Sequence, residues 1–387
     1  MFILEKPYVS EFLIDTIVQN DWAVLDNIAV KDAELEEGVL NLIPTEKAKN
    51  YYLAQEYPLI YGNSENATSW VLKNLPESNL SKYIRLFKDK IQFRDLLKDM
   101  YPDFFYQSVE FDELKKFDTA NLKFPVIIKP AVGFLSIGVQ VVKDAKEWKE
   151  TVSSLEKDIK NASKLYSKDM IDSSKFIIEE FVQGEEFSVD AYFDRDGEPV
   201  VLNIYQHPLL NSKDVRNRMF LMSTGIMIKY MAKFGLLLRE IGQLQNIRNF
   251  PLHLELKVTK DEKIIPIEIN PMRFASWCAT DVAKYAWGVN VYECFKNQTF
   301  PDWNSILSEA HKEVFYYSMI EVPNNIDKSK IQGFEYERFL ANYSNVLEVR
   351  RINPKWNPLF AVVFGSTKSK DEVVKILSLK VNDYIIS

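Results

Sequence analysis

Two glutamates and an asparagine stand in a stretch that otherwise has the apolar pattern of a β-hairpin. The stretch is LHLELKVTKDEKIIPIEINPMR, residues 252–273, and the polar residues are Glu255, Glu268 and Asn270. Apolar residues alternate along both arms, which predicts two strands that each bury one face, and the charged segment TKDEK predicts the turn.

The alternation also predicts the register of this hairpin, because a slip of one residue would turn every apolar side chain to the wrong face. With a turn symmetric about Asp261 and Glu262, the apolar pairs are Val258–Ile265, Leu256–Ile267 and Leu254–Ile269. On the other face, the same register sets Glu255 opposite Glu268 and His253 opposite Asn270.

Like charges directly opposite each other on adjacent strands repel, because their Cβ atoms are only about 5 Å apart. Glu255 and Glu268 become favourable neighbours if a divalent cation lies between them, and hard oxygen ligands of this kind suit magnesium bridged to nucleotide phosphates. The alternative is a solvated face on which the two carboxylates point apart toward lysines. The hairpin alone leaves both interpretations open.

Composition predicts a globular protein that acts on a small molecule. The chain has 387 residues, of which 47% are hydrophobic and 27% charged, enough for two or three domains sharing a core. A net charge of -7, without a long Lys/Arg run, argues against nucleic acid or an anionic membrane as partner. The N-terminal residues have no signal-peptide pattern, and nowhere do about 18 uncharged apolar residues follow one another, so we expect a cytoplasmic protein. Cys278 and Cys294 are too few for a disulfide framework or a thiolate metal site.

Residues 1–85 alternate between short apolar strands and helices, which predicts a small α/β domain. The expected strands are 1–5, 22–26 and 57–63, and the expected helices are 9–20 and 64–75. The segment lacks a GxGxxG motif, so it gives no case for a dinucleotide.

The rest of the chain predicts a second domain over residues 86–300 and a third over 301–387. Expected helices are 88–100 and 224–242; expected strands are 124–130, 139–142, 176–182, 186–193 and 200–206, the last two joined around Asp196 and Gly197. In the tail, residues 360–377 predict a strand, a turn and a helix. No Pro/Gly/Ser-rich linker separates these parts, so we expect them to pack together.

Four motifs, in this order along the chain, resemble the ATP-grasp superfamily. They are DKIQFRDLL, FPVIIKP, IIEEFVQGEEFSVD with its G-x-E step, and HLEL followed by IEINPMR. The resemblance runs from about residue 88 to about residue 281. It implies an α/β (α+β) fold of ATP-grasp type, with a Rossmann-like preceding domain and a closing C-terminal subdomain. Family members commonly join a carboxylate to an amine or to another nucleophile.

The resemblance implies that two lysines contact the nucleotide. Lys129 ends a buried apolar strand, where it would meet the phosphates or the base. Without the resemblance, the favoured interpretation is a lysine whose head reaches solvent from a strand end, and the match to the family's strand lysine reverses that preference. Lys90 matches the family's other nucleotide-contacting lysine, and Lys88 is its near neighbour.

A loop and a linker strand complete the nucleotide site that the resemblance implies. Backbone N–H groups of the loop AVGFLSIGV would cover the phosphates, through Gly133, Ser136 and Gly138. This loop is poorer in glycine than the family's, so with bulky Phe134 and Leu135 it is either stiffer than the family's loop or presents Phe134 to substrate. Adenine would bind the main chain around Glu179, Glu180 and Val182. Glu186 would accept hydrogen bonds from the ribose hydroxyls, unless it is a surface glutamate like Glu185.

The family's metal ligands match Glu255, Glu268 and Asn270 residue by residue, which implies Mg²⁺, or Mn²⁺, bridging the phosphates of ATP. An arginine follows the asparagine closely in many relatives; here Met272 displaces it to position 273. The implied role of Arg273, together with Lys129, is catalytic: stabilising an anionic acyl phosphate and a tetrahedral intermediate.

The sequence indicates less about which residues select the substrate. Arg216 and Arg218 follow a hairpin strand where relatives often place substrate contacts, and paired guanidinium groups suit a carboxylate, although a surface basic cluster fits equally. His207 is either a polar substrate contact or a satisfied loop histidine, and the second interpretation is favoured. Trp277 and Asp281 would line an acceptor pocket, or Trp277 belongs to the core.

The resemblance thus predicts an ATP-dependent ligase for a small carboxylate and an amine, such as an amino acid, releasing ADP and phosphate. Two alternatives are phosphoryl transfer without ligation, and a non-catalytic nucleotide sensor, which the glycine-poor loop motivates. A homodimer is expected from family habit alone.

Overall fold

The computed structural model describes residues 1–31, 38–133, 138–162, 172–208, 218–309, 313–323 and 326–386. Its N-terminal part is a four-stranded parallel sheet in the order β3-β2-β1-β4, flanked by helices. The strands are β1 (Phe2–Ile3), β2 (Ala23–Asp26), β3 (Asn41–Pro44) and β4 (Tyr61–Gly62). The helices are α1 (Glu11–Gln19), α2 (Ile28–Lys31), α3 (Thr45–Leu53) and α4 (Ala67–Asn74). The predicted α/β character of this region is confirmed.

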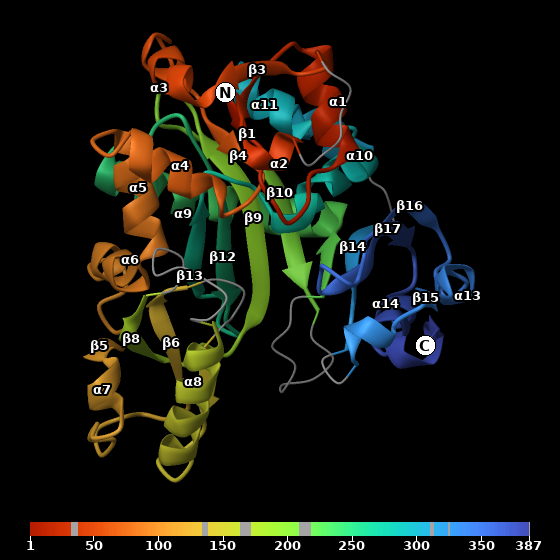
Figure 1. The fold of residues 1–387 in the computed structure, drawn as a ribbon. Helices are drawn as coiled ribbons and strands as arrows, with labels where there is room; N and C mark the ends of the chain where they lie inside the picture. Colours follow the sequence, from red (N-terminus) through yellow and green to blue (C-terminus); the bar gives the residue numbers. More distant parts are fainter. Residues whose placement is uncertain are drawn as a thin grey trace.

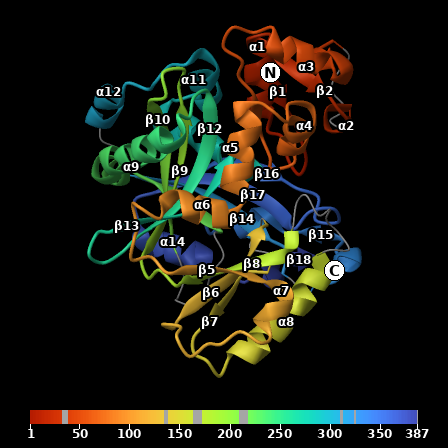
Figure 2. The ribbon, with the colours of Figure 1, turned by 90° about the vertical axis from the view of Figure 1, so that its left-hand side faces the viewer.

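Two helices lead from this part to a second, antiparallel sheet. They are α5 (Asn79–Lys88) and α6 (Lys90–Leu97), and each begins after a residue whose side chain caps its first N–H groups, Ser78 and Asp89. Figure 2 shows both helices between the N-terminal elements and this sheet. The sheet has the order β5-β8-β6-β7, with helices α7 and α8 beside it. Its elements are β5 (Tyr106–Glu110), α7 (Phe111–Leu114), β6 (Val126–Val132), β7 (Gln140–Val142), α8 (Trp148–Ala162) and β8 (Asp172–Glu180).

The largest sheet has eight strands in the order β13-β12-β9-β10-β11-β14-β17-β16 and occupies the middle of the molecule (Figure 1). Its strands are β9 (Glu185–Phe193), β10 (Pro199–His207), β11 (Met219–Met222), β12 (Phe250–Val258), β13 (Ile264–Pro271), β14 (Val314–Glu321), β16 (Val346–Arg351) and β17 (Leu359–Thr367). Helix α9 (Thr224–Gln245) packs on β10, and its buried residues include Tyr230, Phe234, Leu237 and Ile241, which recur at helical spacing. Because β14 pairs with β11, the sheet crosses the expected boundary at residue 300. The division into three domains stays a prediction.

The remaining elements lie after the β12–β13 hairpin or in the C-terminal part of the chain. They are η1 (Ser276–Asp281), α10 (Val282–Trp287), α11 (Val291–Asn297), α12 (Trp303–Ser308), η2 (Lys328–Lys330), β15 (Gly333–Phe334), α13 (Tyr336–Leu340), α14 (Lys370–Leu377), η3 (Val381–Tyr384) and β18 (Ile385–Ile386). The predicted strand, turn and helix of the tail are present as β17 and α14.

The hairpin β12–β13 has the predicted register at the end that carries Glu255 and Glu268 and a different register near its turn. Glu255 pairs with Glu268, His253 with Asn270, and Leu254 with Ile269, as predicted. The predicted pairs Val258–Ile265 and Leu256–Ile267 are wrong: Val258 pairs with Ile264, and Leu256 with Pro266. Thr259 closes the turn by bonding Lys263, so the turn centres on Asp261. A bulge at Ile267 absorbs the resulting offset of one residue.

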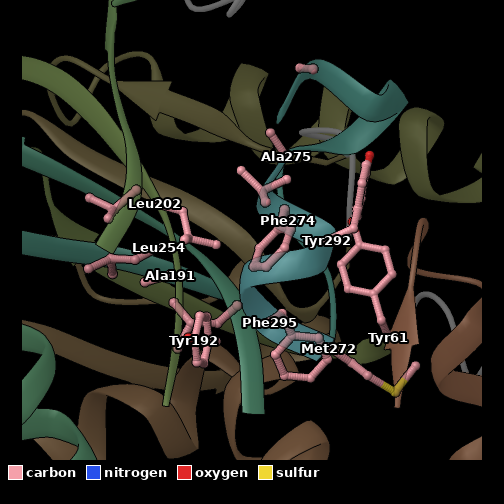
Figure 3. Packing of buried hydrophobic residues seen from close by; sticks show 14 of the residues in the cluster. Tyr61, Ala191, Tyr192, Leu202, Leu254, Met272, Phe274, Ala275, Tyr292 and Phe295 are labelled. Atoms are coloured by element: carbon pink, nitrogen blue, oxygen red, sulfur yellow. The ribbon is translucent and has the colours of Figure 1, made fainter. Parts of the chain in front are cut away.

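One buried aromatic cluster joins the N-terminal sheet to the segment after β13. Tyr61 of β4 lies with its ring centroid 5.1 Å from Phe274 and 5.4 Å from Tyr292 of α11, as Figure 3 shows. The same hydrophobic core continues into β9, β12, β14 and β17. The expectation that the parts pack together is therefore confirmed. No helix among the described residues combines the length and apolar character needed to cross a membrane.

Candidate active site

Glu255 and Glu268 lie directly opposite each other on β12 and β13, and their surroundings treat them differently. Burial and the nearby Glu268 and Glu186 carboxylates raise the pKa of Glu255 to about 8, while Asn270 donates a 3.0 Å hydrogen bond to it. Burial also opposes ionisation of Glu268, but the Lys90 ammonium, 3.1 Å away, and the charge of Lys129 lower its pKa. The pair thus carries its negative charge mainly on Glu268.

Lys90 reaches this pair from the first turn of α6. Its side chain is buried, and its Nζ lies 3.1 Å from Glu268 Oε2 and donates to the Gly133 carbonyl at 3.3 Å. Burial alone would lower the pKa of Lys90, but the Glu268 carboxylate outweighs it and the pKa is raised. Glu268 does face a lysine, as the solvated alternative required, but this lysine is buried and is the one predicted to contact nucleotide. Lys88 instead approaches Glu65, at 3.8 Å.

Lys129 belongs to a buried triad with Glu179 and Arg94. Its Nζ is 2.7 Å from Glu179 Oε2, and Arg94 Nε donates to Glu179 Oε1, also at 2.7 Å. Burial alone would raise the pKa of Glu179, but the two cations lower it to about 2. Burial, with Arg94 and Lys90 nearby, lowers the pKa of Lys129 despite its carboxylate partner. The triad joins α6, β6 and β8 behind the predicted nucleotide site.

Sequence reasoning missed Arg94, although a signal was present. Lys90, Phe93, Arg94 and Leu97 form the buried stripe of α6. A charged residue on the apolar stripe of a helix needs a buried partner of opposite charge, because an unpaired buried charge is costly. Here the partner lies 85 residues further along the chain.

Arg273 lies beyond the end of β13 in a closely held turn. Met272 has a left-handed φ of 65°; its N–H donates to Pro251 O at 2.8 Å, and its carbonyl accepts from Gly62 at 2.9 Å. The extra residue Met272, which moves the arginine to position 273, therefore forms a tight turn in the main chain. The buried Arg273 side chain favours the ionised form of both carboxylates, adding to the fall in the pKa of Glu268 and partly offsetting the rise in the pKa of Glu255, so it lies within electrostatic range of the pair.

The linker between β8 and β9 is the segment predicted to bind adenine. The Glu180 N–H is used by Phe105 O at 3.0 Å, whereas the Val182 N–H has no hydrogen-bond partner within the described part of the chain. A Cβ at Gly184 would come within 2.5 Å of Val258 O, so only glycine fits this close crossing. Glu186 lies 3.6 Å from Lys257 Nζ and is partly exposed.

Some of the predicted residues lie elsewhere or outside the description. Ser136, Phe134 and Arg216 fall outside the described residues, while Gly133 and Gly138 mark the ends of the predicted phosphate loop. Arg218 donates to Leu377 O, at the end of α14. Its role in binding substrate stays a prediction.

His207, Trp277 and Asp281 are all buried. His207 is the last residue of β10 and does not lie in a loop; its Nε2 lies 2.8 Å from Ser188 Oγ, and burial lowers its pKa to about 4. Its buried Nδ1 has no hydrogen-bond partner among the described residues, so the expectation of a satisfied loop histidine is wrong. The Trp277 ring stacks on Tyr8.

Asp281 accepts a 2.8 Å hydrogen bond from Arg350 Nη2 and a 2.6 Å one from the Tyr292 hydroxyl. Its carboxylate is therefore fully engaged within the protein.

The donor set of the hairpin fits magnesium better than a metal held by protein ligands alone. Across the described residues, no three His, Cys, Asp or Glu side chains gather as a metal-binding group. Two opposed carboxylates with an adjacent amide suit a cation that keeps waters and phosphate oxygens as its other ligands. A cation between Glu255 and Glu268 would also remove the repulsion that raises the pKa of Glu255.

Comparison with known proteins identifies the fold. Residues 122–281 match the family model of the ATP-grasp domain. Comparison with curated proteins gives no significant match. Among solved structures, the chain is similar to an L-amino acid ligase from Bacillus licheniformis, with a TM-score of 0.68 and 16% identity over 100% of this chain and 97% of that one.

Two further similarities extend over the whole chain. The biotin carboxylase of Campylobacter jejuni matches with a TM-score of 0.65 and 12% identity, over 100% of this chain and 91% of that one. The phosphoribosylglycinamide synthetase of Anaerococcus prevotii matches with a TM-score of 0.60 and 14% identity, over 100% and 98%. These likenesses confirm the predicted fold class.

Proposed function

We propose that this chain, which carries an ATP-grasp domain within an ATP-grasp fold, is an ATP-dependent ligase that joins a small carboxylate to an amine. ATP phosphorylates the carboxylate, the amine attacks the resulting acyl phosphate, and ADP and phosphate leave. The observation that carries the proposal is the opposed pair Glu255 and Glu268, with Asn270 beside one and Lys90 beside the other.

Glu255, Glu268 and Asn270 would hold magnesium. When bound, magnesium neutralises phosphate charge and orients the β- and γ-phosphates of ATP. The residues' own contribution is to present carboxylate oxygens from two adjacent strands, whose pairing fixes their separation.

Lys90 and Lys129 would supply positive charge to the phosphates. Both are buried, and each is held by one carboxylate, Glu268 for Lys90 and Glu179 for Lys129. A lysine held in this way is oriented before ATP arrives, so little reorganisation accompanies binding. Backbone N–H groups of the predicted phosphate loop would cover the phosphates; residues 134–137 of this loop lie outside the described residues.

The adenosine would lie against the linker strand. The Val182 N–H has no hydrogen-bond partner within the described chain and would donate to the adenine ring, with a carbonyl near Glu179 or Glu180 accepting from its amino group. Glu186 would accept from the ribose hydroxyls, which suits a carboxylate with two oxygens.

Arg273 would stabilise the anionic acyl phosphate and the tetrahedral intermediate that follows it. A guanidinium group offers two parallel donors to such an oxyanion, and its charge is always present. Its proximity to the Glu255–Glu268 pair supports this role, because that pair would hold the magnesium that neutralises phosphate charge.

The proposal is tested by measuring phosphate release from ATP and magnesium with pooled amino acids and small carboxylic acids, each pool with and without an amine. Mass spectrometry then identifies the product in every pool that responds. We expect release to require both an acid and an amine, with a product lighter than their sum by one water.

Three results would argue against ligation. Release that needs the acid alone and yields a stable phosphorylated product would favour phosphoryl transfer. ATP binding without turnover in any pool would favour a nucleotide sensor. Turnover that survives in Glu268→Gln as well as in Glu262→Gln, an exposed glutamate of the same hairpin, would remove the basis for the site.

A further inference from the structure

Glu65, which comes from the N-terminal part of the chain, is the carboxylate against which Arg273 lies. Arg273 Nε donates to Glu65 Oε2 at 3.1 Å across a separation of 208 residues. Glu65 Oε1 also lies 3.8 Å from Lys88 Nζ, and its charge contributes to raising the pKa of Lys90. The side chains of Arg273 and Glu65 are only 11% and 14% exposed, so solvent screens their pairing little.

The loop that carries Glu65 is held rigidly by its neighbours. Asn63 is 2% exposed; its side chain accepts from Glu5 N–H at 2.7 Å and donates to the carbonyls of Glu5 and Tyr8. Ser64 Oγ donates to Lys6 O at 2.7 Å. The main chain on the N-terminal side of Glu65 is thus fixed to residues 5–8, which is how a residue that must aim a neighbouring group is supported.

A second contact places the backbone of Arg273 beside the same loop. Gly62 N–H donates to Met272 O at 2.9 Å, one residue before Arg273. A Cβ at Gly62 would meet Ala67 Cβ at 2.5 Å and Met272 Cε at 3.2 Å, so the approach requires glycine. Figure 3 shows Met272 near Tyr61, the residue that precedes this glycine. Main chain and side chain of the 272–273 segment are therefore both held by residues 62–65.

Two of the three nitrogens of the Arg273 guanidinium group are held by the protein. Its Nε is used by Glu65, and its Nη1 donates to Phe274 O at 2.9 Å. Within the described residues Nη2 makes no hydrogen bond. Two fixed nitrogens define the plane of the group, and its remaining N–H donors are left for an oxyanion, as a transition-state stabiliser requires.

We propose that Glu65 is a positioning residue for Arg273, holding the guanidinium group in the orientation that stabilises the acyl phosphate and the tetrahedral intermediate. The inference rests on the proposed ligase function. The competing explanation is an ion pair that only joins the N-terminal part to the hairpin. That role would affect stability and leave turnover per folded molecule unchanged.

The experiment compares Glu65→Ala, Glu65→Asp and Glu65→Gln with Glu77→Gln, an exposed glutamate of the same part of the chain, in the full-length protein. With the substrates found by the phosphate-release assay, we expect kcat to fall about 100-fold in Glu65→Ala, as for a misplacement of about 1 Å. KM for ATP should change little, because Glu65 pairs with Arg273 and Lys88, whereas the two lysines expected to contact ATP, Lys90 and Lys129, pair with Glu268 and Glu179. Glu65→Gln, which keeps an acceptor oxygen at the same reach, should recover most of kcat, and Glu77→Gln should match the wild type.

A kcat that is unchanged or raised in Glu65→Ala would overturn the inference, and so would a loss that appears wholly in KM for ATP. A loss in Glu65→Ala that Glu65→Gln does not recover would also contradict it, since an acceptor oxygen is what Arg273 Nε uses. A fall in the folded fraction that accounts for the whole loss of activity would indicate the purely structural role.

A readout that needs no activity separates failure of this inference from failure of the proposed function. In NMR spectra of ¹⁵N-arginine-labelled protein, the Arg273 Nε–H signal, assigned with Arg273→Lys, should exchange slowly with solvent in the wild type. It should exchange faster in Glu65→Ala and stay slow in Glu77→Gln. Equal exchange in all three would overturn the inference, whether or not the wild type is an active ligase.

Discussion

Replacing Glu179 by glutamine should destabilise the protein by about 3 kcal/mol at neutral pH, although the change removes only one charge. Lys129 and Arg94 lower the pKa of Glu179 from 4.5 to about 2, which corresponds to about 3 kcal/mol of folding free energy. The side chain is 3% exposed, so solvent screening does not reduce this figure substantially. Breaking a buried pair by removing one partner generally costs about 3–5 kcal/mol, in agreement with it.

The assay is urea denaturation of the wild type and Glu179→Gln at several pH values. Because the pKa of Glu179 is lowered on folding, its stabilisation is present above pH 4.5 and is lost as the pH falls toward 2. The difference between the two proteins should therefore be largest at neutral pH and shrink through this window. Glu180→Gln is the matched control, because this adjacent glutamate makes no ion pair within the described residues.

A difference below about 1 kcal/mol at neutral pH, or one that does not shrink toward pH 2, would refute this reasoning. The first result would mean that the triad is solvated, as a surface ion pair is. The second would mean that the loss comes from packing and not from charge. Affinity for ATP should fall along with stability, since Lys129 loses the carboxylate that orients it.

Two further predictions separate catalytic from structural roles. Glu268→Gln should lower kcat about 100-fold or more, while the free energy of unfolding changes by less than about 1 kcal/mol. Stability changes little because the repulsion between Glu268 and Glu255 is lost along with the ion pair between Glu268 and Lys90. Comparable losses of kcat and of stability, measured by steady-state kinetics and urea denaturation, would mean that Glu268 is structural. His207→Gln should flatten the dependence of stability on pH between 6.5 and about 4. Burial lowers the pKa of the His207 imidazole, so the stabilisation that the neutral ring contributes is present above pH 6.5 and is lost as the pH falls toward 4. A denaturation profile as steep as that of the wild type over this range would contradict the second prediction.

The functional end of the hairpin was predictable from sequence because one of its faces is buried. Alternation then admits one register, and that register sets Glu255 opposite Glu268. The end near the turn was not predictable in this way. Its register depends on a left-handed φ of 60° at Glu262, which no apolar pattern specifies. A bulge at Ile267 restores the predicted pairing before Glu268, so the error did not reach the site.

The side-chain partners of the three cations of the proposed site, Lys90, Lys129 and Arg273, were harder to predict. Arg94 stands on the buried stripe of α6, which indicates that it has a partner but not which one. Glu179 was predicted to contribute its main chain to adenine binding, and the structure adds a role for its side chain. Glu65 gave no signal, because its contact with Arg273 depends on how the N-terminal sheet packs against the hairpin.

The ion pairs of the site explain why its residues are dispersed along the chain. Each buried cation is held by a carboxylate from a different element: Lys90 by β13, Lys129 by β8, and Arg273 by the loop after β4. Such pairs add little net stability, because desolvation offsets most of their attraction. They do fix the direction of each cation before any substrate is present, and this preorganisation is what the transfer of a phosphoryl group requires. A site that consisted of the hairpin alone could hold a metal, but Lys90, Lys129 and Arg273 would have no partners outside the hairpin to fix their orientation. The contacts to α6, to the sheet β5-β8-β6-β7 and to the N-terminal part are therefore what the proposed catalysis requires, and for Arg273 the test is whether removing Glu65 affects kcat more than stability.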